Sequence, residues 1–455
     1  MGIYMTLRRY FIIFSIIIVA SLAIISYMRA SIYHYDVALN YQFTFQNDYS
    51  KTTILELKNN RLLLPAKNSE EQTSFVKMDI ETTLMGRFSQ PSVEITDGKT
   101  SLRQYFEHGA RGTRYINISQ LLCDKGVEIK FTGSHASFDD QQIEFIQMEN
   151  QPLANKRVLI FAAHPDDAEI AAFGLYNGHK DTYVVTVTAG EAGPANYDEI
   201  YQNKVAQFLK KGQVRTWNSL TVPMLGGILP ERILNLGFFD GTLKKMADDP
   251  DLITEGLYTK TSDINIFRSQ NTSSLAAHLT GTANWTSLVQ NMATLLELIK
   301  PDIIVAPLPS LDSHPDHKYT FHALAEAIKL IGKKDGELYL YTNHLLYDFY
   351  PYGEMGSVIS MPPRNSFYFS KIYSHPLSTA DQQSKILALD AMNDLRPDTE
   401  YRFFDVSFGR AFSMMIDNLL GQNVDYFRRS VRSNELFFVI KTEEIYDDEK
   451  LDQLR

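Results

Sequence analysis

Two short clusters of histidine and aspartate lie about 150 residues apart in this chain, His-Pro-Asp-Asp at 164–167 and His-Pro-Asp-His at 314–317. Each follows an apolar run, 157–162 or 302–306, that predicts a buried parallel strand. Because the strand ends along one edge of an open α/β sheet face the same crevice, we expect the two clusters to meet there. Imidazole and carboxylate groups gathered at one point are typical of a hydrolytic metal site.

The residue types in the clusters match the ligands of a catalytic zinc ion. Zinc takes imidazole nitrogen and carboxylate oxygen, and catalytic sites use three protein ligands so that a fourth position stays open. His164, Asp167 and His317 would supply two nitrogens and one oxygen. We therefore expect a Zn²⁺ site, although Fe²⁺ or Co²⁺ could occupy the same ligands.

The remaining cluster residues have the chemistry that a hydrolase needs. Asp166 cannot easily face the same ion as its neighbour Asp167, so we expect it to act as a general base on water. A protonated His314 could stabilise an oxyanion or protonate a leaving amine, and Asp316 could hold its ring. The simpler alternative is that the aspartates only cap the helices that follow. Two such clusters, each after a predicted strand, favour the metal site, and capping and ligation are compatible.

Both motifs resemble those of the PIG-L/LmbE-type zinc de-N-acetylases, which remove acetyl groups from N-acetylglucosamine-containing molecules. The resemblance covers roughly residues 155–345 and leaves out the first 150 residues. It implies the same three zinc ligands, Asp166 as the general base, and His314 with Asp316 as an electrophilic pair. An amidohydrolase that releases acetate is the activity that this resemblance implies.

Weaker similarities to the same family lie between and after the two motifs. The segment 188–193, which contains Glu191, resembles a Gly-rich turn after the second strand of the family. Arg215 resembles an arginine that touches substrate, and Asp240 resembles an aspartate that faces the pocket. The resemblance implies that these three residues bind substrate. His344 ends a predicted strand and is a further pocket candidate, with an ordinary packed or surface histidine as the alternative.

Strand and helix patterns alternate from residue 157 onward. They predict an α/β fold, a doubly wound, largely parallel, Rossmann-like sheet with helices on both faces. We assign this catalytic domain to residues 153–455, including a C-terminal extension. The long polar stretch 242–285 is predicted to be an irregular lid or substrate-side insertion.

Residues 33–152 contain β-rich runs separated by Gly, Asn, Asp and Pro, and no long segment with helical periodicity. This pattern predicts an all-β, sandwich-like accessory domain. The domain could bind sugar or serve as a packing partner of the catalytic domain. The predicted strands are 36–45, 52–57, 75–83, 92–95, 113–118, 127–132 and 142–148.

The N-terminal residues 1–32 predict a membrane anchor. Residues 11–27 carry no charge and are rich in isoleucine, with Arg8 and Arg9 before them. The positive-inside rule then places the N-terminus in the cytoplasm and the catalytic domain in the periplasm or outside the cell. A cleaved signal peptide is the alternative.

Composition excludes a nucleic-acid-binding function. The 455 residues carry a formal net charge of −10 and no basic stripe, and the single cysteine cannot form an internal disulfide. The sequence therefore predicts a membrane-anchored, metal-dependent deacetylase of an N-acetylglucosamine-type sugar in a glycolipid or polysaccharide. An amide hydrolase acting on another N-acylated molecule and an inactive glycan-binding protein are the alternatives.

Overall fold

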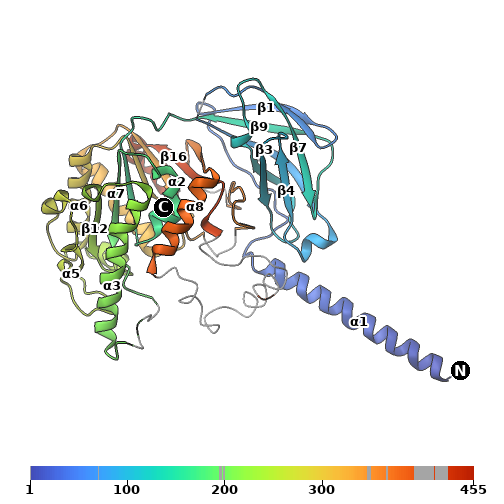
Figure 1. Cartoon of the computed structure of the whole chain (residues 1–455), viewed down its shortest axis with the longest axis horizontal. Coiled ribbons are helices and arrows are strands. Elements are labelled where there is room, and N and C mark those ends of the chain that lie inside the picture. The colour runs from blue at the N-terminus through green and yellow to red at the C-terminus, as the bar shows by residue number, and fades with distance from the viewer. Residues whose placement is uncertain are drawn as a thin grey trace.

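The structure is a computed structural model, and it describes residues 2–69, 71–193, 197, 200–345, 350–364, 367–393, 415 and 429–455. Figure 1 shows a long N-terminal helix, a β-rich unit in blue and teal, and an α/β unit in green to red. The mixed α/β class and the N-terminal apolar helix agree with the sequence analysis. The proposed domain boundaries remain predictions.

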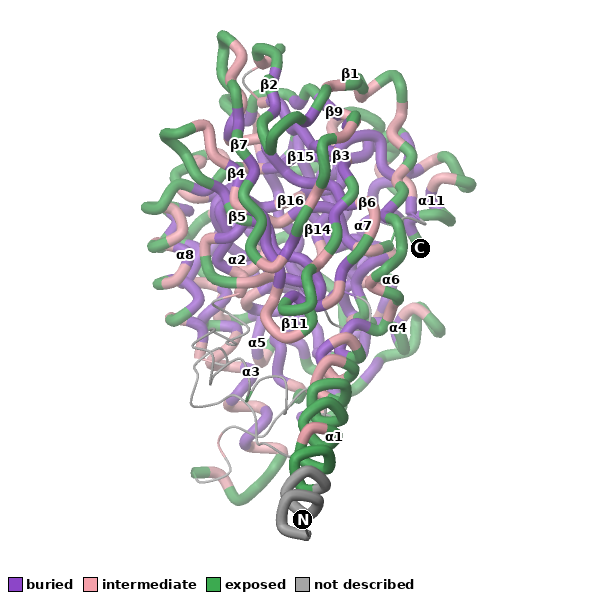
Figure 2. Tube along the Cα trace, turned by 90° about the vertical axis from the view of Figure 1, so that its right-hand side faces the viewer, coloured by how far each residue is buried: buried purple, intermediate pink, exposed green. Residues whose placement is uncertain are grey.

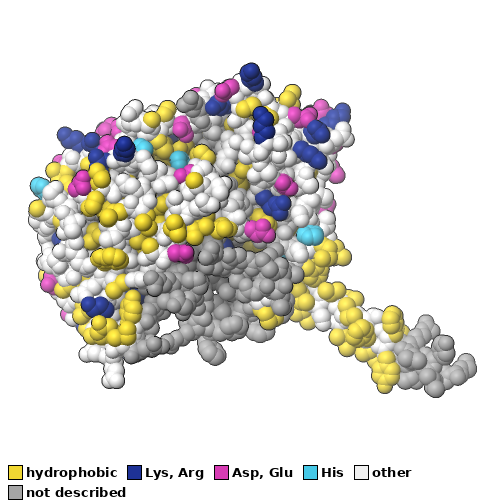
Figure 3. Space-filling model, in the orientation of Figure 1, with side chains coloured by type: hydrophobic (Ala, Val, Ile, Leu, Met, Phe, Trp, Pro, Cys, Tyr) yellow, Lys and Arg dark blue, Asp and Glu magenta, His cyan; other side chains and the backbone are white. Residues whose placement is uncertain are grey.

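Helix α1 (Gly2–Ser31) projects away from the rest of the molecule (Figure 1). Its segment Tyr10–Ser31 has a mean hydropathy of 2.6 and no buried residue in its most apolar window. Figure 3 shows hydrophobic side chains along the described part of this helix, whereas charged side chains are scattered over the two folded units. The segment is therefore long and apolar enough to cross a membrane, a property that a signal sequence shares.

Two antiparallel sheets form the β-rich unit. One has the strand order β1-β9-β3-β6, with β8 paired to β3, and the other has the order β2-β7-β4-β5. Alternate side chains of both sheets, such as Val76 and Phe145 from one and Ile95 and Phe131 from the other, fill a shared core. The strands are β1 (Ser50–Leu57), β2 (Arg61–Leu64), β3 (Gln72–Thr82), β4 (Ser92–Thr96), β5 (Ser101–Tyr105), β6 (Arg111–Asn117), β7 (Val127–Ser134), β8 (Ala136–Ser137) and β9 (Gln141–Glu149).

The predicted strand at 36–45 is wrong, because this segment has no strand assignment. Its backbone is held in another way. The guanidinium of Arg114 donates hydrogen bonds to the carbonyl oxygens of Val37 (2.6 Å) and Leu39 (2.9 Å). A side chain thus satisfies carbonyl groups that a neighbouring strand would otherwise bind.

A seven-stranded sheet forms the centre of the α/β unit, in the order β12-β11-β10-β13-β14-β16-β15. The first five strands are parallel, and β16 runs antiparallel to both β14 and β15. The edge strand β15 was not predicted from the sequence. The strands are β10 (Val158–Ala162), β11 (Thr182–Thr188), β12 (Ile233–Phe238), β13 (Ile303–Pro307), β14 (Glu337–Tyr341), β15 (Lys371–Pro376) and β16 (Asn434–Lys441).

Helices cover both faces of this sheet. Leu159 and Phe161 of β10 enter a core that includes residues of α6 and α7, whereas Val158 and Ile160 enter a second core with residues of α2 and α8. The segment predicted to be irregular, 242–285, contains the short helices α4 and α5. The helices are α2 (Asp167–Tyr176), α3 (Lys204–Thr221), α4 (Leu243–Asp248), α5 (Asn265–Arg268), α6 (Trp285–Ile299), α7 (Pro315–Ile331), α8 (Thr379–Ala391) and α11 (Asp448–Leu454).

The β-rich unit packs directly on the edge of the seven-stranded sheet. Phe75 and Tyr115 point away from the sandwich core and belong to the same hydrophobic core as Ile372 of β15. Ser374 N–H of β15 donates to Thr73 Oγ1 of β3 at 2.9 Å. Figure 2 shows a buried, purple interior that continues from the β1–β9 region to β14 and β16.

Candidate active site

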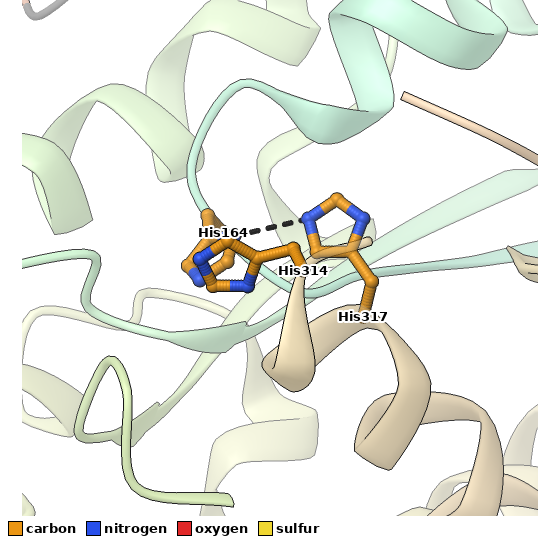
Figure 4. Close-up of side chains that lie close together, drawn as sticks. All are labelled: His164, His314 and His317. Carbon is orange, nitrogen blue, oxygen red and sulfur yellow. Dashed lines mark hydrogen bonds between the residues drawn. The ribbon is translucent and has the colours of Figure 1, made fainter. Parts of the chain in front are cut away.

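The sheet order brings the two histidine–aspartate clusters together. Strands β10 and β13 are parallel neighbours, and each ends just before one cluster. The imidazole rings of His164, His314 and His317 gather at this edge of the sheet (Figure 4). The ring of His164 has its centroid 4.6 Å from that of His314 and 5.2 Å from that of His317.

Three donor atoms form a small triangle. His164 Nδ1 lies 3.2 Å from His317 Nε2 and 3.4 Å from Asp167 Oδ2, and the latter two atoms are 3.1 Å apart. For tetrahedral coordination with bonds of about 2.0–2.1 Å, the distance between two ligand atoms is about 3.3 Å. The three side chains are buried, with exposed fractions of 6%, 1% and 0% for His164, Asp167 and His317. Both the spacing and the donor types fit one transition-metal ion.

The second polar atom of each predicted ligand is also held. His317 Nδ1 hydrogen-bonds to Asp312 Oδ2 at 2.9 Å, and Asn343 Nδ2 donates to Asp167 Oδ1 at 2.8 Å. His164 Nε2 lies 3.1 Å from Asp240 Oδ1. A carboxylate on the far nitrogen of a histidine fixes the tautomer that offers its other nitrogen to a metal. The outer contacts therefore orient all three donor atoms toward one point.

The charges around the histidines favour a cation. Burial opposes protonation of His317, but the carboxylates of Asp167 and Asp312 outweigh it and raise its pKa to about 10. Burial likewise opposes protonation of His164, but Asp240 and Asp167 raise its pKa well above the usual value. Since the carboxylates make a proton on either ring favourable, they would also favour a divalent cation at the same place.

Asp166 lies beside the donor triangle in a strained conformation. Its φ is 125°, in the left-handed region that a non-glycine residue rarely adopts and that is often found at functional sites. Asp166 is the N-cap residue of α2 but makes no capping hydrogen bond with its side chain. Instead, Arg215 Nη2 donates to Asp166 Oδ2 at 3.1 Å. Helix capping therefore does not explain why an aspartate stands here.

Arg215 also supports the backbone around the first cluster. Its Nη2 donates to the carbonyl oxygen of Pro165, and its Nη1 donates to the carbonyl oxygen of Gly190, both at 2.7 Å. These contacts give Arg215 a positioning role toward Asp166. Its contact with substrate, which the family resemblance implies, stays a prediction.

His314 is the N-cap of α7, and its Nδ1 accepts a hydrogen bond from Asp316 N–H at 3.2 Å. Burial, with the charges of His164 and His317, lowers the pKa of His314 to about 3. This pKa favours a neutral ring, and because Nδ1 accepts from Asp316 N–H, the ring proton is on Nε2. A neutral Nε2–H still donates a hydrogen bond.

The expectation that the Asp316 carboxylate holds the His314 ring is wrong. Asp316 Oδ2 accepts from Gly241 N–H at 2.6 Å, and its Oδ1 accepts from Leu243 N–H at 3.3 Å. In the first turn of α7, the side chain of the N-cap residue His314 accepts a hydrogen bond from the backbone N–H of Asp316. The His314 ring therefore contacts the backbone of Asp316 and not its carboxylate. Asp316 thus ties α7 to the loop that carries Asp240.

The other predicted pocket residues fall into two groups. Asp240 and His344 lie at the site, and the His344 ring centroid is 5.0 Å from that of His317. Glu191 is fully buried, and its Oε2 accepts from Asp240 N–H at 3.1 Å. The carboxylate of Glu191 thus supports the backbone of Asp240, and a direct contact of Glu191 with substrate stays a prediction.

Sequence reasoning missed Asp312 and Asn343, which hold two of the predicted ligands. Asp312 stands two residues before the second motif, and Asn343 follows strand β14. The neighbour relation of β13 and β14 places both at the same edge of the sheet. A polar residue at the end of a third buried strand was the available signal for Asn343.

Residues 159–328 match the sequence profile of the PIG-L family, described as GlcNAc-PI de-N-acetylase. No curated protein matches the chain.

Several solved structures are similar at low identity. N,N'-diacetylchitobiose deacetylase from Pyrococcus horikoshii, in complex with an inhibitor, is 16% identical over 64% of this chain and 87% of that chain, with a TM-score of 0.34. A deacetylase of the A40926 pseudoaglycone is 15% identical over 63% and 98%, with a TM-score of 0.31. A 4-carboxy-2-hydroxymuconate hydratase from Pseudomonas putida is 12% identical over 63% and 96%, with a TM-score of 0.32. The segment that matches the PIG-L family model, residues 159–328, contains both His-Pro-Asp motifs.

Proposed function

We propose that this protein is a metal-dependent deacetylase that hydrolyses the N-acetyl group of an N-acetylglucosamine-type sugar to a free amine and acetate. The observation that carries the proposal is the triangle of His164 Nδ1, Asp167 Oδ2 and His317 Nε2, with sides of 3.1–3.4 Å. The family match supports the substrate class, since its description names a de-N-acetylase of a GlcNAc compound.

His164, Asp167 and His317 would hold the metal ion. Two imidazole nitrogens and one carboxylate oxygen suit Zn²⁺, and Fe²⁺ or Co²⁺ also accept this set. When bound, the ion would act as a Lewis acid that polarises the amide carbonyl and makes water a stronger nucleophile. Asp312, Asp240 and Asn343 keep the ligand atoms in place.

The residues around the donor triangle would move the protons. Asp166, positioned by Arg215, takes a proton from the attacking water and passes it to the amine as the carbon–nitrogen bond breaks. His314 donates its Nε2–H to the carbonyl oxygen as negative charge develops there. The products are acetate and the free amino group, so atoms and protons balance.

The N-terminal helix supports a place at a membrane. We propose that α1 anchors the protein with the N-terminus in the cytoplasm and the active site in the periplasm or outside the cell. The excess of arginine before the apolar segment, Arg8 and Arg9 against Arg29 after it, is the basis for this orientation. A glycolipid or surface polysaccharide would then be the accessible substrate.

Metal analysis combined with an acetate-release assay tests the proposal. The purified protein should contain one metal ion per chain and release acetate from N-acetylglucosamine glycosides or glycolipids, and a chelator should abolish the release. Asp166→Asn should lower turnover by about 10²–10⁴-fold while metal content is unchanged. The matched control is Asp335→Asn, since the Asp335 side chain is 85% exposed and forms an ion pair with Lys333.

The outcomes separate the alternatives. A protein that binds metal but releases acetate only from other N-acylated compounds would be a different amide hydrolase. A folded protein that binds glycans equally well with and without the Asp166→Asn change, and hydrolyses nothing, would be a binding protein. A folded protein that takes up no metal would refute the proposal.

A further inference from the structure

A pocket of about 90 Å³ lies next to the candidate metal site, lined by residues of α2, α8, β16 and the end of β14. Asn343 lines this pocket and also holds Asp167 through its side-chain amide. Asn343 therefore belongs to both the pocket and the candidate metal site. Most of the polar lining, including Lys385, Arg429, Arg432 and Glu435, lies outside the segment that matches the PIG-L family.

Arg432 is the unusual group in this pocket because half of its guanidinium lacks a partner. The side chain is 2% exposed. Its Nη1 donates to the carbonyl oxygens of Tyr352 (2.7 Å) and Glu354 (2.8 Å) and to Ser357 Oγ (2.6 Å). Its Nε and Nη2 are buried and have no hydrogen-bond partner in the described part of the chain.

The geometry of that unpaired edge selects the ligand. Nε and Nη2 lie on the same side of the planar guanidinium, and together they form a fork that binds two oxygens of a phosphate or carboxylate. The opposite nitrogen is fixed by the 352–357 loop, so the fork cannot turn away freely. A buried polar edge without a partner is rare in a native protein, because leaving it unpaired costs free energy.

Among the described residues that line the pocket, no carboxylate is left to pair with Arg432. Glu435 is the one acidic residue in that described lining. It already pairs with Lys385 at 2.7 Å and accepts the backbone N–H groups of Gly174 (2.8 Å) and Leu175 (2.9 Å). Burial, followed by the charge of nearby Arg429, lowers the pKa of Arg432 to about 9, although Tyr352 opposes this shift. Two cationic groups therefore lie near each other at this wall.

We propose that this pocket binds a phosphate group through the Nε and Nη2 edge of Arg432, beside the metal site. The two N–H groups of this fork match two oxygens of a phosphate and can bind both at once. Binding itself does not depend on the proposed deacetylase function. Only the further step rests on that function: the phosphate is part of the substrate, and its binding places the N-acetyl group at the metal site.

Inorganic phosphate and chelator-treated protein test the binding, because removal of the metal excludes phosphate binding to an ion. Titration calorimetry at constant ionic strength should show saturable binding to the wild-type chain. Arg432→Lys keeps the charge but loses the fork, and we expect the Kd to rise about ten-fold or more. The control is Arg268→Lys, since Arg268 is also buried with an unpaired Nη2 but is not part of this pocket.

Absence of saturable binding in the wild-type chain would overturn the proposal, as would an unchanged Kd in folded Arg432→Lys. If that variant does not fold, a wild-type crystal soaked in tungstate gives an independent answer. Anomalous density at the Arg432 fork supports the proposal, and density elsewhere contradicts it.

Acetate-release kinetics decide the source of the phosphate. If the substrate carries it, Arg432→Lys should raise the KM for N-acetylglucosamine 1-phosphate about ten-fold and leave the KM for an unphosphorylated glycoside unchanged. Equal KM values in both proteins, with phosphate binding intact, would refute the substrate assignment and identify free phosphate as the ligand. If neither compound is hydrolysed, the deacetylase proposal fails while the phosphate titration still decides the pocket.

Discussion

Replacement of Asp312 by asparagine is the most direct test of how the candidate metal site is organised. Asp312 is fully buried. Its Oδ2 accepts from His317 Nδ1 at 2.9 Å and from the N–H groups of Asn343 (3.1 Å) and His344 (3.2 Å), and its Oδ1 accepts from His314 N–H at 3.0 Å. One carboxylate thus orients a predicted ligand and joins the two loops at the site.

The magnitude follows from what an asparagine can replace. The single carbonyl oxygen of asparagine can replace Oδ2 and accept the same three hydrogen bonds. The NH₂ group then replaces Oδ1 and cannot accept the hydrogen bond from His314 N–H. One buried donor is left unpaired, which costs about 1–3 kcal/mol of folding free energy. Loss of the carboxylate on His317 should weaken metal binding by about 10–100-fold, equivalent to about 1.4–2.7 kcal/mol.

Competition with a chromophoric zinc chelator measures the metal affinity, and thermal melting of the chelated protein measures the stability. Asp312→Asn should lose affinity, whereas Asp335→Asn, an exposed control near the next strand, should not. At saturating zinc, part of the acetate release should return in Asp312→Asn. A folded Asp312→Asn protein with the metal affinity of the wild type would refute the idea that the outer carboxylate orients His317.

Three further predictions concern stability and location. Burial, with the charges of Asp166 and Asp167, raises the pKa of Glu169 to about 8 from a usual value near 4.5. The folded state therefore holds a proton that the unfolded chain has released, and this contribution to stability is lost as the pH rises from about 4.5 to 8. Glu169→Gln should remove this pH dependence, so the Tm of the variant relative to that of the wild type should rise between pH 5 and pH 8. Tm curves of the two chelated proteins that run parallel over this range would contradict the prediction. Glu107→Gln breaks a buried ion pair with Arg114 (3.3 Å) and should destabilise the protein by about 3–5 kcal/mol in urea unfolding, whereas Glu128→Gln, in an exposed pair, should change little. A chain that starts at Met28 keeps the buried Arg29, and we expect it to fold and to be found in the soluble fraction. Retention of this chain in the membrane fraction would show that α1 is not the membrane-binding element.

Strong local patterns explain which elements were predictable. Strand β11 (Thr182–Thr188) is an element that the sequence makes predictable, because its run of β-branched residues gives a clear strand signal. Strand β15 was missed, since Lys371–Pro376 contains a histidine and a proline and lies at the edge of the sheet. The segment 36–45 has strand-like alternation, but its aromatic side chains serve packing and Arg114 binds its backbone.

The residues of the candidate site also differ in how well the sequence predicts them. His164, Asp167 and His317 were found because each follows a buried strand, and parallel strands place such residues at one edge. Asp312 and Asn343 carry no motif, and their value depends on hydrogen bonds across 5 and 176 positions of the chain. Such pairs are set by the tertiary structure. The neutral state of His314 likewise depends on two neighbouring histidines that only the folded chain brings close.

The packing of the β-rich unit bears on its role. Phe43 and Phe45 extend toward Phe369, with ring centroids 6.3 Å and 5.9 Å apart, and Phe369 also contacts Phe438 of β16 at 5.5 Å. These aromatic side chains thus attach the β-rich unit to the edge of the seven-stranded sheet. Strand β16 also carries Glu435 and adjoins Arg432, so this attachment supports one wall of the proposed phosphate pocket. We therefore infer that the β-rich unit is a packing partner of the α/β unit. Damage at this interface should disturb the proposed phosphate pocket before it disturbs the predicted metal ligands, which come after β10 and β13 in the chain.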